Sequence, residues 1–567
     1  MPFTFQHPYV FDDRFRKPVA YCCMEFAIHQ PLKIYAGGLG FLAGSHLRAA
    51  YALRQNLVAV GILWKYGYYD QVRKSDQTMD MLFQEKGYGF LEQTGIRFTI
   101  EVSGHEVWVE VWYLRPEIFR TAPLFLLSTD VPENDYLSKT ISHKLYDANP
   151  ETTTAAAILL GVGTMKLFDY LDWQPALFHL NESHALPLAF YLYKRYLRIE
   201  EVQKRLVYTN HTPEQGGNRQ MDYLLLEKMG FFCHVPIAEV KQLMGGNGPA
   251  LHQTRCALRF AGRANGVSAL HVTTLNTWFG EVPGMPPWQT ITNAQDFDYW
   301  ANKEMYEALQ AGDTATVAAL KAYAKKQLFE LVADQNGEIL DEKVFTLVFA
   351  KRFAGYKRPA LLLSDPDRFH RLVTNEKRPI QIIWAGKPYP MDYTAIGVFD
   401  RIVHTCRQYR NCSTLVGYEL QLSRWLKQGA DGWLNVPRMR HEASGTSGMS
   451  AAMNGAVNIS MPDGWFPEFA RDKVNSFVIP PAPPDKADHE QDAIEANHLY
   501  NLLEQAILPM FYDDPQRWMS IVQQGMRDIL PYFDSKRLAQ EYYEKLYDPA
   551  DSRVVQLMPA GQHAAAF

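Results

Sequence analysis

The feature that most constrains the fold is a repeated order of segments: a short apolar run, a cluster of polar or glycine residues, then an amphipathic helical pattern. The clearest apolar runs are residues 57–63, 176–180 and 206–208 in the first half and 344–349 and 380–384 in the second. Continuous apolar runs of this length are typical of parallel strands buried on both faces. Polar residues directly after such strands lie at the carboxyl edge of the sheet, where open α/β sheets bind ligands. We therefore expect an α/β fold with two Rossmann-like domains that face one another across a cleft.

The length of 567 residues exceeds what one hydrophobic core organises, so at least two domains are expected. A helical pattern over residues 304–331 and a turn over 334–337 place the boundary between residues 289 and 343. The prolines of residues 479–484 predict an exposed loop, and the pattern after them predicts terminal helices. The expected division is residues 1–300, residues 301–535 and a final segment of residues 536–567.

Composition excludes several classes of partner. The chain has 57 basic and 62 acidic side chains and a net charge of −5, whereas nucleic-acid binding requires a clustered positive face. Its six cysteines form no CxxC pair and no zinc-like spacing, so we expect reduced thiols and no metal site. The N-terminal residues lack the apolar run of a signal peptide, and the apolar stretch 155–162 is too short to span a bilayer. A cytoplasmic protein without a membrane or nucleic-acid partner is predicted.

Residues 442–450 read Glu-Ala-Ser-Gly-Thr-Ser-Gly-Met-Ser and precede Ala-Ala-Met-Asn-Gly-Ala. This string resembles the signature of the α-glucan phosphorylases, which carry a lysine at the position of Ser450. In that family the lysine holds pyridoxal phosphate as a Schiff base. A serine hydroxyl cannot form an imine because it lacks the amine nitrogen. The resemblance therefore implies a family member without a covalent cofactor. Non-covalent pyridoxal phosphate, or a free phosphate in its place, stays open.

The resemblance to the shorter bacterial-type α-glucan phosphorylases covers most of the chain. Residues 34–40, with Gly37, Gly38 and Leu39, resemble the family's glycine-rich loop. Tandem glycines let backbone N–H groups approach an anion, and the following helix N-terminus adds a favourable field. A simple tight turn has the same composition, so the anion-binding interpretation of this loop depends on the motifs that accompany it.

A second match is the basic segment 351–358, Lys-Arg-Phe-Ala-Gly-Tyr-Lys-Arg. The resemblance implies that Arg352 and Lys357 bind phosphate groups in the catalytic cleft. Fixed cations in a closed site stabilise the charge that develops on a departing glycosyl phosphate. Most basic runs are solvated helix faces, but this one directly follows a buried strand, which favours the functional interpretation.

Further matches concern the sugar and the cofactor pocket. The resemblance implies that His211 and Asn265 hydrogen-bond the glucosyl unit and that Glu442, Ser444 and Gly445 hold sugar hydroxyls. It also implies a phosphate or cofactor pocket bordered by Lys351, Tyr418, Thr446 and Ser450, with Lys387 in a family-like setting. The aromatic cluster Trp64, Tyr66, Tyr68 and Tyr69 either stacks sugar rings or packs in the core. One departure is residues 291–296, which begin like a family segment and then lose its glycine.

The family implies the glycosyltransferase B fold, with the last helix crossing back onto the first domain. It also implies retaining transfer of glucosyl units to or from an α-1,4-glucan or maltodextrin. Three functions remain open at this point. The protein is a phosphorylase that uses phosphate or glucose 1-phosphate, a glycogen synthase-like enzyme that uses a nucleotide sugar, or a catalytically silent glucan-binding or regulatory protein. A homo-oligomer is also left open.

Overall fold

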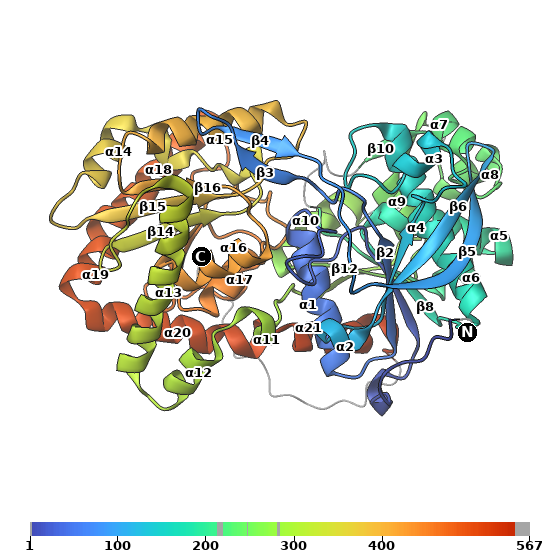
Figure 1. Ribbon diagram of the computed structural model, residues 1–567, viewed down its shortest axis with the longest axis horizontal. Coiled ribbons are helices and arrows are strands. Elements are labelled where there is room, and N and C mark those ends of the chain that lie inside the picture. The colour runs from blue at the N-terminus through green and yellow to red at the C-terminus, as the bar shows by residue number, and fades with distance from the viewer. Residues whose placement is uncertain (1–2, 213–218, 247, 281–283, 550–567) are drawn as a thin grey trace.

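The computed structural model describes residues 3–212, 219–246, 248–280 and 284–549. Within these residues the chain forms two large sheets that lie side by side and are covered by helices (Figure 1). The first sheet comes from the first half of the chain and the second from the second half. The mixed α/β class predicted from the sequence is confirmed.

The first sheet has nine strands in the order β13-β12-β9-β8-β1-β2-β7-β6-β5. It is parallel from β13 to β7, and β6 and β5 extend it as antiparallel edge strands. The strands are β1 (Val19–Cys22), β2 (Leu57–Ile62), β5 (Glu92–Val102), β6 (His105–Leu114), β7 (Leu124–Ser128), β8 (Leu177–Asn181), β9 (Leu206–Thr209), β12 (Arg263–Gly266) and β13 (Trp288–Thr290). The direction of chain progression reverses between β1 and β8, which makes this pair the topological switch point.

The second sheet has six strands, all parallel, in the order β16-β15-β14-β17-β18-β19. The strands are β14 (Phe345–Ala350), β15 (Ile380–Ala385), β16 (Cys412–Leu415), β17 (Gly432–Asn435), β18 (Val457–Ser460) and β19 (Ser476–Val478). Numbered along the chain, this order is 3-2-1-4-5-6, the doubly wound arrangement of dinucleotide-binding folds. Its switch point lies between β14 and β17.

All five predicted strands are confirmed, with bounds that differ by one or two residues. Every residue of β2, β14 and β15 is buried, as expected for strands with helices on both faces of the sheet. The two small antiparallel pairs are β3 (Asp70–Arg73) with β4 (Met79–Leu82) and β10 (Gln220–Asp222) with β11 (Ala250–His252). The hairpin of β3 and β4 reaches the second sheet, where the Met79 N–H donates to Asp400 Oδ1 on α15 (Tyr393–Cys406) at 3.1 Å (Figure 1).

The helices of the first half pack mainly around the first sheet. They are α1 (Gly38–Ala52), α2 (Pro116–Phe119), α3 (Tyr136–Thr140), α4 (Pro150–Leu171), α5 (Pro187–Tyr196), α6 (Ile199–Gln203), α7 (Tyr223–Met229), α8 (Ile237–Met244), α9 (Gln253–Phe260), α10 (Ala269–Phe279) and α11 (Phe297–Trp300). The expectation that the apolar run at 155–162 is too short for a bilayer needs correction, because α4 continues it to 22 residues and is long and apolar enough to cross one. Yet 78% of its most apolar window is buried inside the structure, as in the core helix of a soluble protein.

The helices of the second half include the predicted boundary helix and the predicted terminal helices. They are α12 (Lys303–Gln310), α13 (Thr314–Asn336), α14 (Pro366–Val373), α15, α16 (Leu420–Gly429), α17 (Ser447–Ala452), α18 (Asp488–Leu502), α19 (Leu508–Asp513), α20 (Pro515–Phe533) and α21 (Ser535–Glu541). The proline-rich segment 479–484 is a loop, but it is only partly exposed, because the Ala482 N–H donates to the buried Glu495 carboxylate.

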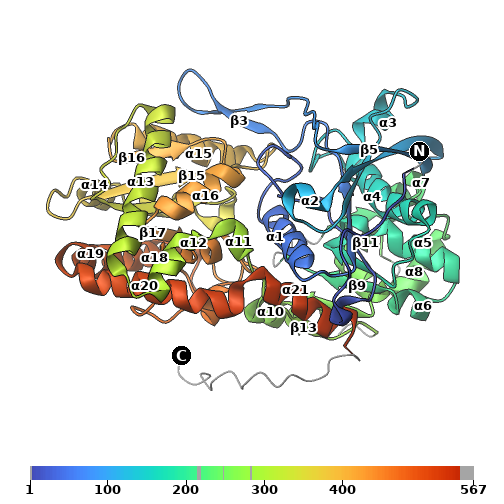
Figure 2. The same cartoon turned by 60° about the horizontal axis from the view of Figure 1, so that its bottom comes forward.

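The last helices run from the second sheet to the first. Figure 2 shows α20 and α21 in red along one side of the molecule. Past α20, the chain pairs with the segment that departs from the family pattern: the Gln295 N–H donates to Phe533 O, and the Ser535 N–H donates to Gln295 O. A final π-helix (Tyr542–Tyr547) places the Tyr547 hydroxyl 2.6 Å from His179 Nδ1 on β8. Residues 542–547 thereby pack against the first sheet.

Candidate active site

The switch points of the two sheets bring several polar side chains to their carboxyl edges. Glu25 follows β1 and Glu182 follows β8, while Lys351 follows β14 and Asn435 ends β17. The gap where strand order reverses at this edge is the usual ligand site of doubly wound sheets. The charge of Arg352 acts on Glu25: burial raises the pKa of the Glu25 carboxyl, while hydrogen bonds and this nearby cation work against the rise. The edge of the second sheet therefore lies close to that of the first.

The glycine-rich loop is held in place by Glu25, a residue that the sequence analysis missed. Glu25 Oε2 accepts the N–H groups of Ala36 and Gly37 at 2.7 and 3.1 Å, and Oε1 accepts the Tyr146 hydroxyl at 2.6 Å. A Cβ added to Gly37 or Gly38 would meet no atom within 4 Å, so both glycines face open space. Leu39 follows them, partly buried, in the first turn of α1. The signal that could have found Glu25 is its position shortly after the buried strand β1, past Cys23 and Met24.

His211 forms a neutral hydrogen-bonding group with the residues after β8. Its Nε2 lies 2.7 Å from Asn181 Oδ1, and its backbone N–H donates to Glu182 Oε1 at 2.6 Å. Burial, with the nearby charges of His271 and His184, lowers the pKa of His211 to about 3. Its imidazole is therefore uncharged at neutral pH and suits hydrogen bonding to a sugar better than proton donation.

Glu182 is held in a strained backbone conformation, with φ 68° and ψ 175°. This region of backbone space is unfavourable for a residue with a side chain and persists only where surrounding contacts enforce it. The contacts here are the His211 N–H and the Thr212 hydroxyl, which both donate to Glu182 Oε1. Such strain is typical of functional sites, and sequence patterns carry no signal for it.

Asn265 lies deeper than the other sugar-binding candidates. It is on β12 with 0% exposure; its Oδ1 accepts the Thr209 hydroxyl at 2.5 Å and its Nδ2 donates to Gly266 O. In this arrangement the amide supports the end of β9 beneath His211. A direct contact between Asn265 and a sugar remains a prediction.

The basic segment after β14 carries three cations with different surroundings. The side chain of Lys357 forms an ion pair with Glu442, whose carboxylate outweighs the effect of burial and raises the Lys357 pKa. Lys351 is buried and donates to Asn435 Oδ1, and its pKa falls to about 7 because of burial and the charge of Lys357. Arg352 is exposed. The segment thus presents an exposed guanidinium that interacts with Tyr356, an ammonium paired with a carboxylate, and a lysine that gains or loses its proton near neutral pH.

The 442–450 segment forms a loop that enters α17. The N–H groups of His441 and Glu442 donate to Asp463 Oδ2, which orients the Glu442 carboxylate toward Lys357. Gly445 has φ 82°, a value that favours glycine. Ser444 is 2% exposed, and its Oγ has no hydrogen-bond partner among the described residues. Glu442 and Gly445 are accessible, whereas Ser444 lies below the surface of the loop.

Thr446, Ser450 and Tyr418 line the buried side of this loop. Thr446 directly precedes α17 without a side-chain capping hydrogen bond, and the Ser450 hydroxyl points back into its own helix, 3.4 Å from Thr446 O and 3.3 Å from Ser447 O. The Tyr418 hydroxyl donates to Ala350 O at the end of β14 at 3.1 Å. Tyr418 therefore ties the loop after β16 to the strand that precedes the cations.

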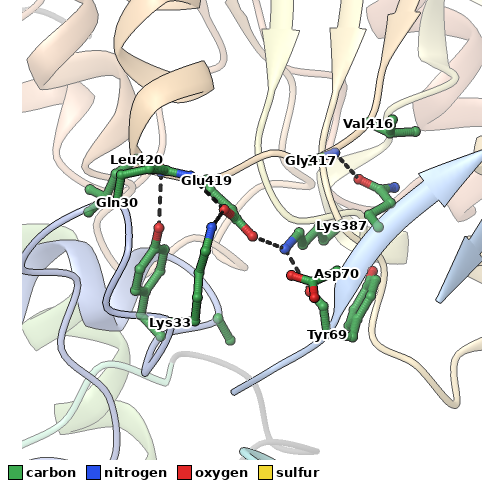
Figure 3. Close-up of polar contacts among 12 residues, drawn as sticks. Gln30, Lys33, Tyr69, Asp70, Lys387, Val416, Gly417, Glu419 and Leu420 are labelled. Carbon is green, nitrogen blue, oxygen red and sulfur yellow. Dashed lines mark hydrogen bonds and ion pairs between the residues drawn. The ribbon is translucent and has the colours of Figure 1, made fainter. Parts of the chain in front are cut away.

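Lys387 belongs to a network between the two halves of the chain (Figure 3). Its Nζ donates to Glu419 Oε1 at 2.8 Å and to Tyr69 O at 2.9 Å. The same Glu419 carboxylate pairs with Lys33 and accepts from Gln30 Nε2. Lys387 is thus placed to join the halves and has no free ammonium for a ligand.

The aromatic cluster near the β3–β4 hairpin packs in the core. Trp64, Tyr68 and Tyr69 are at most 5% exposed, and Tyr66 is partly buried. The hydroxyls of Tyr68 and Tyr69 both donate to Pro388 O, across the same boundary that Lys387 spans. Of the two roles open in the sequence, the structure supports core packing. Among the described residues there is also no group of three or more His, Cys, Asp or Glu side chains that could hold a metal.

Comparison with known proteins gives the family. A family model described as carbohydrate phosphorylase matches residues 303–476. An uncharacterized protein of Methanocaldococcus jannaschii is 45% identical, over 94% of this chain and 100% of that protein. A maltodextrin phosphorylase of Thermococcus litoralis is 30% identical, over 96% of this chain and 72% of that protein. A glycogen phosphorylase of Mycobacterium tuberculosis is 30% identical, over 94% and 71%. The chain belongs to the α-glucan phosphorylase family of glycosyltransferases.

Proposed function

We propose that this protein is a retaining α-1,4-glucan glucosyltransferase that acts on a maltodextrin-like glucan with phosphate or glucose 1-phosphate, without covalent pyridoxal phosphate. The observation that carries the proposal is the meeting of two sets of groups at the carboxyl edges of the sheets. The second sheet contributes Lys351, Arg352 and Lys357, and the first contributes the open glycine loop and the neutral His211. Cations suit a glycosyl phosphate, and neutral donors and acceptors suit a sugar.

The proposed arrangement is the glycosyltransferase B fold, with a domain of residues 1–300, a domain of residues 301–535 and a return segment from residue 536. Two separate sheets, each with a reversal of strand order, support this division. The cleft between the domains would be the active site. The contacts of α21 with α1 and Gln55, and of the π-helix 542–547 with β8, support the return segment.

Arg352 and Lys357 would hold the phosphate that leaves or attacks the glucosyl carbon. In the free protein Lys357 is neutralised by Glu442, so an arriving anion competes for the ammonium and frees the carboxylate. The freed carboxylate can then accept sugar hydroxyls beside Gly445 of the same loop, whereas the buried Ser444 would support the loop from below. Loss of one charge-stabilising donor of this kind reduces rates by about 10²–10³. The Lys357–Glu442 ion pair would thereby couple phosphate binding to sugar binding.

The absence of a covalent cofactor follows from chemistry at position 450. Ser450 has no amine for an imine, and its hydroxyl is directed at carbonyls of its own helix. When bound, pyridoxal phosphate would supply a second phosphate beside that of the substrate. Lys351, Thr446 and Tyr418 border that position in this chain.

The donor test separates the three functions. Purified protein is offered glucose 1-phosphate and, separately, several nucleotide-glucose donors, each with a maltodextrin acceptor. We expect chain elongation and phosphate release from glucose 1-phosphate. Elongation from a nucleotide donor alone would establish the synthase-like enzyme. Glucan binding without transfer from any donor would leave the silent binding protein.

The proposed setting is the cytoplasm, with no membrane and no nucleic-acid partner. The net charge of −5 and the burial of α4 support this. Fractionation of native cells with an antibody to the chain checks it, because a membrane-bound pool resistant to salt would contradict the proposal.

A further inference from the structure

A cofactor ring held at position 450 would need space within reach of that side chain. Ser450 is 0% exposed, so no space wide enough for a water molecule touches it, either inside or outside the molecule. The space around the start of α17 is therefore filled by neighbouring side chains. The question is which residues fill it and what they leave open.

Asn454 connects the backbone of Ser450 to that of Trp300, one of the residues that fill this space. Its Nδ2 donates to Ser450 O at 2.8 Å and to Trp300 O at 2.9 Å. Trp300 is 1% exposed, and its indole lies 5.4 Å, centroid to centroid, from the ring of Phe41 on α1. The Phe41 ring in turn lies 6.5 Å from that of Tyr418. An aromatic layer between two rings requires about 3.5 Å on each side. A cofactor ring therefore does not fit between Phe41 and Trp300, nor between Phe41 and Tyr418.

Lys427 completes the filling from α16, which packs against α17. Its Nζ lies 3.6 Å from the Trp300 ring centroid and 5.4 Å from that of Phe41. The side chain is 0% exposed, and Nζ has no hydrogen-bond partner among the described residues. Burial of an amine without a hydrogen-bond partner is unfavourable. An apolar side chain would fill the same space without this cost. The lysine instead lies against the face of an indole, and burial lowers its pKa well below the usual value.

The cationic side of the same region is open. Arg352 is exposed, and Lys351, Thr446 and Tyr418 each keep 8% of their surface accessible. An anion can therefore approach Arg352 directly, with the partly accessible Lys357 and the nearly buried Lys351 behind it, while the space toward Ser450 is closed. This shape suits a small inorganic anion better than a phosphate that carries an aromatic ring.

We propose that Phe41, Trp300 and Lys427 form a plug that closes the cofactor-ring space of this chain, so that the protein excludes pyridoxal phosphate and takes inorganic phosphate at the cations beside the plug. The same closure excludes a nucleobase from that space. The phosphate part rests on the proposed function, since it uses the same cations. The closure itself rests on packing alone.

The first experiment uses the unmodified protein. Binding of pyridoxal phosphate is followed by absorbance and by borohydride reduction with peptide mass analysis, and binding of inorganic phosphate by calorimetry. We expect no stoichiometric pyridoxal phosphate and saturable binding of phosphate. Stoichiometric uptake of pyridoxal phosphate, or a pyridoxyl group trapped on Lys427, would overturn the proposal. Absence of phosphate binding would overturn its second part.

The second experiment tests the plug directly. Ser450→Lys restores the amine but leaves the plug, so we expect no imine absorbance. Ser450→Lys combined with Lys427→Val and Phe41→Val opens the space, and we expect an imine that borohydride traps at position 450. The matched control is Ser450→Lys with Lys321→Leu, which removes another buried lysine, one that donates to Asn454 O at 3.0 Å. We expect no imine in this control.

Uptake of pyridoxal phosphate by Ser450→Lys alone would contradict the plug. A folded triple variant that takes up no pyridoxal phosphate would also contradict it. Circular dichroism establishes whether the triple variant folds, and if it does not, the unmodified protein and the single variant still decide. Neither readout requires catalysis. A protein that fails the donor test but excludes pyridoxal phosphate would contradict the proposed function and support the plug.

Discussion

At the scale of single residues, the free protein compensates most of the positive charge of the candidate site with its own groups. Lys357 is balanced by Glu442, and Lys351 is balanced by losing its proton near neutral pH. Only Arg352 of the three presents an exposed charge. Uncompensated buried charge is strongly unfavourable, so a free protein with this many cations needs such compensation. The consequence is that ligand binding must change both the ion pair and the protonation of the site.

Lys357→Gln tests the role of the ion-paired cation. The amide can still donate to Glu442, so we expect the melting temperature to stay within a few degrees. Transfer from glucose 1-phosphate should fall by about a hundredfold or more, because the cation that stabilises the leaving phosphate is gone. Steady-state kinetics and thermal unfolding measure the two effects. Lys377→Gln, at an exposed lysine of the same half, is the control and should change neither. Early unfolding with activity intact would contradict the assignment.

The proton of Lys351 predicts a pH dependence of anion binding. Its pKa in the free protein is lowered to about 7, and a bound anion raises it by favouring the ammonium. Affinity should therefore be highest below this pH and weaken as the pH rises through it, by up to about tenfold per unit. Sulfate is the probe, because its own charge is constant over this range, and calorimetry at several pH values measures it. Lys351→Arg should flatten the profile. An unchanged slope in that variant would show that another group titrates.

At the scale of elements, the glycine loop depends on how closely α1 approaches the loop after β1. A Cβ at Gly44 would lie 2.0 Å from Ala27 O, whereas one at Gly38 would meet nothing within 4 Å. The two glycines therefore serve different purposes on the same helix. Gly44 permits packing against the backbone, and Gly38 leaves room at the site.

Gly44→Ala and Gly38→Ala form a matched pair. We expect Gly44→Ala to lower the free energy of unfolding by about 1–3 kcal/mol, because the helix must shift away from Ala27. Gly38→Ala should leave stability nearly unchanged but weaken glucan or phosphate binding by filling the open space. Thermal unfolding and calorimetric binding separate the outcomes. Equal stability loss in both variants would show that the loop is purely structural.

At the scale of the whole molecule, many long-range polar contacts join the two halves, and the network around Glu419 is one of them. The Glu419 carboxylate joins Lys387, which lies beyond β15, to Lys33 of the N-terminal half (Figure 3). The segment after α20 adds a second connection through Gln295. Contacts such as these join the two halves of the chain.

Glu419→Gln removes both ion pairs and leaves the buried ammonium of Lys387 without its carboxylate. Breaking such a pair by removing one partner costs about 3 kcal/mol. We expect a lower melting temperature and faster hydrogen exchange in residues 30–36 and 386–390, which meet at this network. Glu92→Gln breaks the exposed pair with Arg115 and serves as the control. Equal exchange in both variants would contradict a joining role for Glu419.

Much of the fold and part of the site could be predicted from sequence. The apolar runs identified buried strands such as β2 and β14 because burial on both faces selects apolar residues over a short local stretch. The cations after β14 and the Glu442 loop were found because they directly follow a strand or form a contiguous motif. Each of these signals lies within about ten consecutive residues. They sufficed for the α/β class, the family and the cations.

The tertiary structure alone decided what surrounds those groups. Glu25 supports the glycine loop from 11 residues away, Asn435 accepts from Lys351 across 84 residues, and Lys427 approaches Trp300 across more than a hundred. Sequence by itself determined that Ser450 cannot hold an imine, since that follows from the side chain. Whether a cofactor ring has space depends on packing among Phe41, Trp300 and Lys427, which come from three different helices. Packing of this kind is non-local, and no short pattern in a single sequence records it.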